Sequence, residues 1–191
     1  MPANPLLIFD TWYQDHLHQC QLPLPSACCL STVGLDGFPN ARFVSLKEVV
    51  QEQFIVTGPT DSRKGQEIAA NGQVALTFWW AETERQVRVQ GVAKAISEAQ
   101  ADTYFAERNH ASQAVSVVCQ QGQPLTDMAA IEQAYGQLNE QNQPIARPNA
   151  WGGWAISPHR IELMAFKHTR FHERWSYERV GEYWEATQLQ P

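Results

Sequence analysis

The sequence is poor in cysteine and has no long apolar segment. Its 191 residues include four cysteines, none of them in a C-x-x-C pair. We therefore expect reduced structural thiols at Cys20, Cys28, Cys29 and Cys119, with a disulfide or metal role as the less favoured alternative. No run of 18 apolar residues occurs, and the amino-terminal residues show neither a basic patch before an apolar stretch nor a cleavage site. These absences predict a cytoplasmic protein.

Positive charge is also scarce. The 14 Lys and Arg residues are outnumbered by 20 Asp and Glu residues, so the formal net charge is -6. This balance argues against nucleic-acid binding, which depends on neutralising phosphates. A protein of this composition that binds a small anion must bring its few cations together locally.

Several motifs that carry chemistry are absent. The sequence has no G-x-G-x-x-G, no phosphate loop, no G-x-S-x-G and no H-E-x-x-H. Of the six histidines, His16 and His18 lie two apart on a predicted helix and therefore point in different directions. The histidine spacing predicts no metal site.

The order of predicted elements indicates an α+β protein with an antiparallel sheet and helices packed outside it. Helical spacing or capping predicts helices over 4–19, 62–71, 98–108, 112–119 and 126–140. Alternation and apolar runs predict strands over 27–33, 41–50, 53–57, 74–80, 85–95, 153–157, 160–166, 172–178 and 182–186. We expect one domain over 1–191, with an N-terminal helix (1–20), a barrel core (27–95), a helical segment (97–141) and C-terminal strands (151–191).

A few cations stand at the ends of these elements. Arg42 and Lys47 are five residues apart on one predicted strand, so their side chains point to opposite faces. Ser62-Arg63-Lys64 opens a predicted helix with Ser62 as its N-cap, where free backbone N–H groups favour an anion. Taken alone, each of these patterns is more typical of a solvated surface.

In combination, these segments resemble a known family. The segments are Arg42-Phe43-Val44-Ser45-Leu46-Lys47, Thr57, Ser62-Arg63-Lys64, Glu84-Arg85-Gln86-Val87, Trp151-Gly152-Gly153 and Arg170-Phe171-His172-Glu173-Arg174. In this order and spacing they are similar to the pyridoxamine 5′-phosphate oxidases, over nearly the whole chain. The resemblance implies a split β-barrel that binds flavin mononucleotide (FMN) at the subunit interface of a homodimer.

The resemblance also assigns residues to the cofactor and to the substrate. The implied cofactor-binding residues are Arg42, Phe43, Val44, Ser45, Leu46, Lys47, Thr57, Ser62, Arg63, Lys64, Gln86, Gln121, Gly122, Met164 and Arg174. The implied substrate-binding residues are Lys47, Tyr104, Arg108, Ser112, Arg170 and His172. Tyr104, Arg108 and Ser112 are four apart and would form a stripe if one helix carried them all, although Asn109-His110 could break that helix.

The implied reaction is the oxidation of pyridoxamine or pyridoxine 5′-phosphate to pyridoxal 5′-phosphate. The 4′ carbon gives a hydride equivalent to the flavin, and oxygen reoxidises the flavin with release of hydrogen peroxide. Arg170 and His172, the implied catalytic residues, orient the substrate. Alternatives are a related flavin oxidase of the phenazine-biosynthesis type, a non-catalytic flavin- or B6-phosphate-binding protein, and a purely structural protein. Lys47 and Tyr104, which the phenazine-type relatives tend to lose, favour the oxidation of pyridoxamine or pyridoxine 5′-phosphate.

Four features depart from the family pattern. The loop Gly58-Pro59-Thr60-Asp61 is slightly longer, and Val56 stands where an aromatic residue is common. Gly122 replaces a hydroxyl-bearing residue, and Met164 replaces a tryptophan near the flavin. A thioether packs without the indole N–H, so FMN affinity or potential could differ from that of other members.

Overall fold

The computed structural model describes residues 4–141 and 143–191, so residues 1–3 of the predicted N-terminal segment (1–20) lie outside the described residues. The described helices are α1 (Pro5–Gln19), α2 (Arg63–Ala70), α3 (Glu98–Ala106), α4 (His110–Val118) and α5 (Met128–Gln141). The strands are β1 (Ala27–Val33), β2 (Pro39–Val50), β3 (Gln53–Pro59), β4 (Gln73–Trp80), β5 (Arg85–Ala95), β6 (Trp151–Ala165), β7 (Glu173–Val180) and β8 (Tyr183–Leu189). No helix within the described ranges is long and apolar enough to span a membrane.

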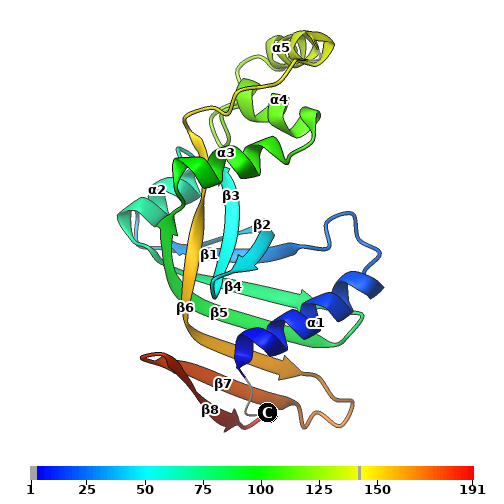
Figure 1. Cartoon of the computed structure of the whole chain (residues 1–191), viewed down its shortest axis with the longest axis vertical. Coiled ribbons are helices and arrows are strands. Elements are labelled where there is room, and N and C mark those ends of the chain that lie inside the picture. Colours follow the sequence, from blue (N-terminus) through cyan, green and yellow to red (C-terminus); the bar gives the residue numbers. More distant parts are fainter. Residues whose placement is uncertain (1–3, 142) are drawn as a thin grey trace.

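Six strands close into an antiparallel barrel, which confirms the predicted class. In the order β3-β2-β1-β4-β5-β6 each strand pairs with its neighbour, and β3 pairs with β6 to complete the ring. The first half of β6 pairs with β3, and its second half pairs with β7. β7 and β8 therefore extend the sheet away from the barrel, at the opposite end of the molecule from α3, α4 and α5 (Figure 1).

The prediction of two separate strands over 153–157 and 160–166 was wrong, because β6 is continuous. Gly91 lies opposite Pro158 whereas Gln90 lies opposite Arg160, so the register with β5 shifts at the proline. A bulge accommodates a residue that cannot donate to the ladder and lets the strand continue.

Helix α1 packs against the barrel through aromatic residues. Its Phe9 is buried, with ring centroids 4.9 Å from Phe54, 5.1 Å from Phe78 and 5.7 Å from Trp80. The helix begins after Asn4, whose side chain accepts a hydrogen bond from the N–H of Leu6. This packing fixes the orientation of α1 and holds its carboxyl end against the turn between β4 and β5.

The stripe of Tyr104, Arg108 and Ser112 does not lie on one helix. Helix α3 ends at Ala106, and α4 begins at His110 with Asn109 as its N-cap. The Asn109 side chain accepts a hydrogen bond from Ser112 N at 2.8 Å, which starts a new helix instead of continuing the old one. The cap explains why a helix predicted over 98–108 stops early.

All four cysteines are free, as predicted. Cys28 is buried in the barrel, and Cys29, its neighbour in β1, is half-buried. Burial, followed by the charge of Cys29, raises the pKa of the Cys28 thiol to about 12, so this thiol is an unreactive part of the core.

Candidate functional site

A cleft of about 900 Å³ opens beside the amino end of α2. Its walls come from β2, the end of β3, the start of α2, the link between α3 and α4, α4 itself and the segment after it. The predicted site residues that line it are Arg42, Phe43, Val44, Ser45, Thr57, Ser62, Arg63, Lys64, Arg108, Ser112, Gln121 and Gly122. Predicted cofactor residues and predicted substrate residues therefore meet in one cleft.

The amino end of α2 forms one wall. Ser62 is its N-cap residue, but the side chain does not cap the helix. Instead Ser62 Oγ donates to the carbonyl oxygen of Pro59 at 2.7 Å and accepts from Lys64 Nζ at 3.1 Å. The N–H groups of a first helical turn have no acceptor within the helix, so this end offers donors and the positive end of the helix dipole to an anion.

Glycine is required where the loop before α2 touches the helix. A Cβ at Gly65 would lie 2.0 Å from the carbonyl oxygen of Thr60, so a side chain there would push the loop away. Gly122, at the other side of the cleft, has φ +86, a left-handed conformation that glycine adopts most readily. The departure at Gly122 thus has a conformational reason in this chain.

Lys64 places a buried ammonium group in this wall. Its Nζ donates to Ser62 Oγ and, at 2.5 Å, to Gln121 Oε1, and both of these partners are neutral. Burial, followed by the charge of Arg42, lowers the pKa of Lys64 to about 8, although Asp61 acts in the opposite direction. A desolvated cation with neutral partners would be stabilised by an anion bound in the cleft.

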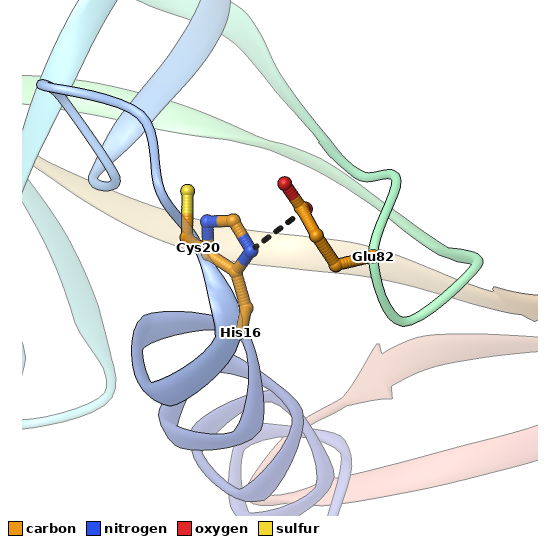
Figure 2. A group of neighbouring side chains, drawn as sticks. All are labelled: His16, Cys20 and Glu82. Carbon is orange, nitrogen blue, oxygen red and sulfur yellow. Dashed lines mark ion pairs between the residues drawn. The ribbon is translucent and has the colours of Figure 1, made fainter.

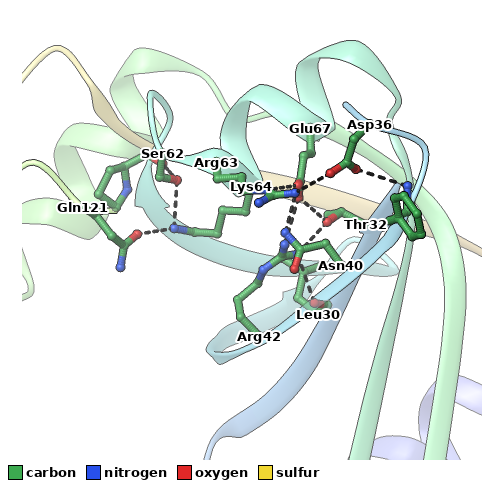
Figure 3. A network of polar contacts seen from close by, with 12 residues as sticks. Leu30, Thr32, Asp36, Asn40, Arg42, Ser62, Arg63, Lys64, Glu67 and Gln121 are labelled. Atoms are coloured by element: carbon green, nitrogen blue, oxygen red, sulfur yellow. Dashed lines mark hydrogen bonds and ion pairs between the residues drawn. The ribbon is translucent and has the colours of Figure 1, made fainter. Parts of the chain in front are cut away.

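Glu67 holds the neighbouring cations in place (Figure 3). Its carboxylate is fully buried and accepts hydrogen bonds from Thr32 at 2.6 Å and from Asn40 at 2.8 Å. It also accepts from Arg42 and from Arg63, both at 2.9 Å. Burial alone would raise the pKa of Glu67, but the hydrogen bonds and the charge of Arg42 outweigh it and lower the pKa to about 2. The carboxylate is therefore ionised at neutral pH.

These bonds leave Arg42 with donors for a ligand. Its guanidinium donates to Leu30 O, Thr32 Oγ1 and Glu67 Oε2, which uses three of the five N–H groups among the described residues. Arg63 lies further out, with a side chain that is 63% exposed and also paired with Asp36 at 3.2 Å. Arg42 and Arg63 thus have fixed positions and free capacity, which is what an anion site needs.

Arg108 faces the same cleft from the link between α3 and α4. Its guanidinium lies over the ring of Trp151, 5.0 Å from the centroid, and donates to Ser112 O at 3.0 Å. Its Nε is buried and has no hydrogen-bond partner among the described residues. Burial lowers the pKa of Arg108 from its usual value, which marks a cation whose solvation is incomplete.

Lys47 and Tyr104 lie beside the cleft. Lys47, at the bulge in β2, pairs with Glu107 at 2.5 Å, and Glu107 itself lines the cleft. Lys47 Nζ is 5.5 Å from the ring centroid of Tyr104, whose hydroxyl donates to Glu48. Burial, and then the hydrogen bond to Glu48, raise the pKa of Tyr104 to about 12, so its hydroxyl stays a donor. Leu46 is buried in the core, so only its backbone could face a ligand.

A second group of predicted cofactor residues lies elsewhere. Gln86 is opposite Met164, and Met164 is opposite Arg174, so the three form one row across β5, β6 and β7. β6 is 15 residues long; Trp151, which lines the cleft, begins it, and Met164 lies next to its end. At about 3.3 Å per residue the two are roughly 40 Å apart along the strand. The row therefore does not complete the cleft of its own chain.

Arg170 and His172 lie in the loop after β6, close to that row. The His172 ring centroid is 4.7 Å from that of Phe166, and His172 Nδ1 accepts from the N–H of Lys167 at 3.1 Å. Arg170 has φ +67, a left-handed conformation that is uncommon for a residue other than glycine. Arg170 is exposed in this loop and does not line the cleft of its own chain.

Sequence reasoning missed the residues that organise the cations. Thr32, Asn40 and Glu67 were not predicted as part of the site, although they fix Arg42 and Arg63. The spacing of four between Arg63 and Glu67 was a readable signal of a pair on one helix face. Thr32 in β1 and Asn40 in β2 contact Glu67 in α2. These contacts join residues that are distant in the sequence, so no local pattern indicated them.

Two family models match the chain. The model described as pyridoxamine 5′-phosphate oxidase matches residues 15–142. The model described as the pyridoxine 5′-phosphate oxidase C-terminal dimerisation region matches residues 151–191. Among related sequences, the pyridoxine/pyridoxamine 5′-phosphate oxidase of Acaryochloris marina is 39% identical over 191 residues, which cover 99% of this chain and 87% of the relative. The corresponding protein of Thermosynechococcus vestitus is 40% identical, over 98% of this chain and 89% of the relative.

Two solved structures resemble the fold. PhzG from Burkholderia lata, in complex with tetrahydrophenazine-1-carboxylic acid, has a TM-score of 0.94 and 28% identity, over 100% of this chain and 94% of the other. A pyridoxamine 5′-phosphate oxidase-related, FMN-binding protein from Nostoc punctiforme has a TM-score of 0.82 and 16% identity, over the whole of both chains. The second likeness concerns the fold alone.

Proposed function

The chain belongs to the pyridoxamine 5′-phosphate oxidase family, and we propose that it uses FMN to oxidise pyridoxamine and pyridoxine 5′-phosphates to pyridoxal 5′-phosphate. Oxygen is the proposed acceptor, and hydrogen peroxide the second product. The observation that carries the proposal is the cleft in which the cations around α2 meet Arg108 and Ser112. Two separate sets of cations in one cleft suit two phosphorylated molecules lying next to each other.

The residues around α2 fit the phosphate of FMN. Lys64 is a buried cation with neutral hydrogen-bond partners, and the free N–H groups of the first turn adjoin it. Arg42 and Arg63 add guanidinium donors whose positions Glu67 fixes. When bound, FMN supplies the acceptor for a hydride equivalent; the protein holds and orients it.

The row of Gln86, Met164 and Arg174 would reach FMN only from a second copy of the chain. The match of residues 151–191 to a dimerisation region supports a homodimer, and β6 and β7 of that region contribute Met164 and Arg174. In a two-fold dimer each row meets the partner's cleft, so two equivalent sites form. Met164 would place a thioether against the flavin.

The other set of cations suits the phosphate of the substrate. Arg108 and Ser112 line the cleft, and Lys47 and Tyr104 adjoin it. Tyr104, with a raised pKa, keeps its proton, and a phosphate bound there would replace Glu48 as the acceptor of that proton. Arg170 and His172 of the second copy would cover the substrate ring, orient its 4′ carbon and exclude water.

The proposal predicts a yellow dimer that releases peroxide as pyridoxal 5′-phosphate forms. Pyridoxamine and pyridoxine 5′-phosphates should be assayed side by side in air-saturated buffer. Arg170→Asn, which tolerates the left-handed backbone, and His172→Ala should retain FMN and lose about 100-fold in kcat/KM through misplacement of the substrate. His168→Ala, a change in the same loop, is the matched control. Unchanged turnover in both variants would remove their role, and FMN binding without any turnover would favour the non-catalytic reading.

A second candidate is oxidation of a tricyclic ring substrate. The TM-score of 0.94 to PhzG, whose structure contains tetrahydrophenazine-1-carboxylic acid, favours this alternative. That ligand carries a carboxylate and no phosphate, so Lys47→Ala should impair oxidation of the pyridine phosphates more strongly than that of a tetrahydrophenazine. Turnover of the tetrahydrophenazine alone by the unmodified protein would decide for the alternative.

The lowered pKa of Lys64 predicts a pH dependence of FMN binding. With a pKa of about 8 in the ligand-free protein, Lys64 loses its charge as the pH rises through 8, so FMN affinity should fall there. Binding of the phosphate near this pH should take up a proton, measurable by calorimetry in buffers of different ionisation enthalpy. Lys64→Arg stays charged in this range and should show neither effect. The same pH dependence in Lys64→Arg would contradict the assignment.

A further inference from the structure

Three side chains that can bind metals converge far from the cleft. His16 lies in the last turn of α1, Cys20 is the residue that ends this helix, and Glu82 belongs to the turn between β4 and β5 (Figure 2). One nitrogen, sulfur or oxygen atom from each lies within 4.8 Å of the other two. His16 and Cys20 are four residues apart, so they share one face of the helix end. None of the three lines the cleft.

Within the described part of the chain, the hydrogen bonding of His16 leaves its buried Nδ1 without a hydrogen-bond partner beside Cys20 and Glu82. His16 is 4% exposed, and its Nε2 lies 2.9 Å from the carbonyl oxygen of Pro25. A carbonyl can only accept, so Nε2 carries a proton, and in the neutral form of the ring Nδ1 is the nitrogen with the free lone pair. Nδ1 has no hydrogen-bond partner among the described residues, and its distance of 3.9 Å to Glu82 is too long for one.

The ring of His16 is also held in its orientation. It stacks on Trp80 with the centroids 5.4 Å apart and the planes 18° apart. A histidine that ligates a metal usually donates its other N–H to a carbonyl or carboxylate, which fixes the tautomer and the ring. The bond from His16 to Pro25 has this form.

We propose that His16 Nδ1, Cys20 Sγ and a carboxylate oxygen of Glu82 form a three-ligand site for Zn²⁺ or a similar thiophilic divalent cation. Nitrogen, thiolate and carboxylate are all zinc ligands, and a water molecule would complete a tetrahedron. Bonds of about 2.0–2.3 Å need ligand atoms roughly 3.3–3.8 Å apart, so atoms now within 4.8 Å of one another must approach by up to about 1–1.5 Å. Glu82, whose side chain is 34% exposed in a turn, can make that movement.

Binding would tie the carboxyl end of α1 to the turn between β4 and β5. The ion pair of Asp15 with Arg85, at 2.7 Å, already joins these elements nearby. Zinc would displace the thiol proton of Cys20, which is released to solvent, and no bond other than this S–H breaks. Gln86, a proposed flavin contact, lies four residues beyond Glu82. A metal bound to Glu82 would therefore also restrain the start of β5.

The test is metal binding by the FMN-loaded protein. Zn²⁺ should be titrated by calorimetry in competition with a weak chelator, and Co²⁺ followed by its visible spectrum for thiolate coordination. We expect a single tight equivalent per chain, a thiolate signal with Co²⁺ and a higher Tm with Zn²⁺. Cys20→Ser and Glu82→Gln should weaken binding at least about tenfold, the loss that even outer partners of a metal site cause.

Two exposed neighbours serve as matched controls. His18→Gln and Glu84→Gln change the same residue types on the same helix end and turn, and should leave zinc affinity unchanged. His16→Gln removes a stacked ring and could lower stability, so the decision rests on Cys20→Ser and Glu82→Gln at partly exposed positions. Absence of a tight equivalent in the unmodified protein, full affinity in both deciding variants, or a cobalt spectrum without thiolate character would each overturn the proposal.

Discussion

Replacing Glu67 by alanine is expected to lower the free energy of unfolding by about 3–5 kcal/mol. The carboxylate is fully buried and accepts four hydrogen bonds, two of them from Arg42 and Arg63. Its removal leaves Arg42 partly buried without its counter-charge and leaves buried donors without an acceptor. Urea denaturation at neutral pH measures the loss. Glu132→Ala, at an exposed position on α5, is the matched control and should change stability by less than about 0.5 kcal/mol.

The contribution of Glu67 should also depend on pH in a defined direction. Its pKa is lowered to about 2 in the folded protein, whereas an unfolded glutamate titrates near 4.5. The group therefore binds fewer protons when folded, and stabilises the protein by about 3 kcal/mol above the unfolded pKa. This contribution is lost as the pH falls from about 4.5 towards 2. The stability difference between the unmodified protein and Glu67→Gln should narrow over this range, and a constant difference would show that ionisation of Glu67 is not its source.

Mixing two impaired variants is expected to restore activity at an FMN concentration that saturates only a site with an intact Lys64. Lys64→Met removes a charged hydrogen-bond donor from the cleft and should weaken FMN binding by about 10–100-fold. Arg170→Asn alters the loop that we propose enters the partner's cleft. In a mixed dimer both changes fall in one site, and the other site is intact. Co-refolded equal amounts should therefore regain about one quarter of the activity of the unmodified protein, since half of the dimers are mixed and each has one working site.

The double variant separates this arrangement from one in which each chain completes its own site. The double variant carries Lys64→Met and Arg170→Asn on the same chain. When it is mixed with unmodified chains, each site of a mixed dimer receives one of the two changes, so mixed dimers should be inactive. If each chain used its own loop, the two single variants would not complement, and the mixed dimers with the double variant would keep one working site. A site shared between the two chains requires both results: complementation in the first mixture and inactive mixed dimers in the second.

Much of the local structure could be read from the sequence. Alternating apolar residues predicted the barrel strands, and the Arg63-Lys64 pair after a turn predicted the cationic start of α2. The exceptions have local physical causes that compete with the pattern. A bulge at Pro158 joined two predicted strands, and the cap at Asn109 divided a predicted helical stripe.

By itself the sequence determined the class of fold, the free state of the cysteines and the membership of the family, because these depend on periodicity and on motifs within short segments. Only the tertiary structure decided how distant residues meet. It joined Thr32, Asn40 and Glu67 around the cations, separated Met164 from the cleft by the length of β6, and brought Glu82 to His16 and Cys20. Such contacts depend on strand register and on closure of the barrel, which distant parts of the chain set together and no local pattern encodes.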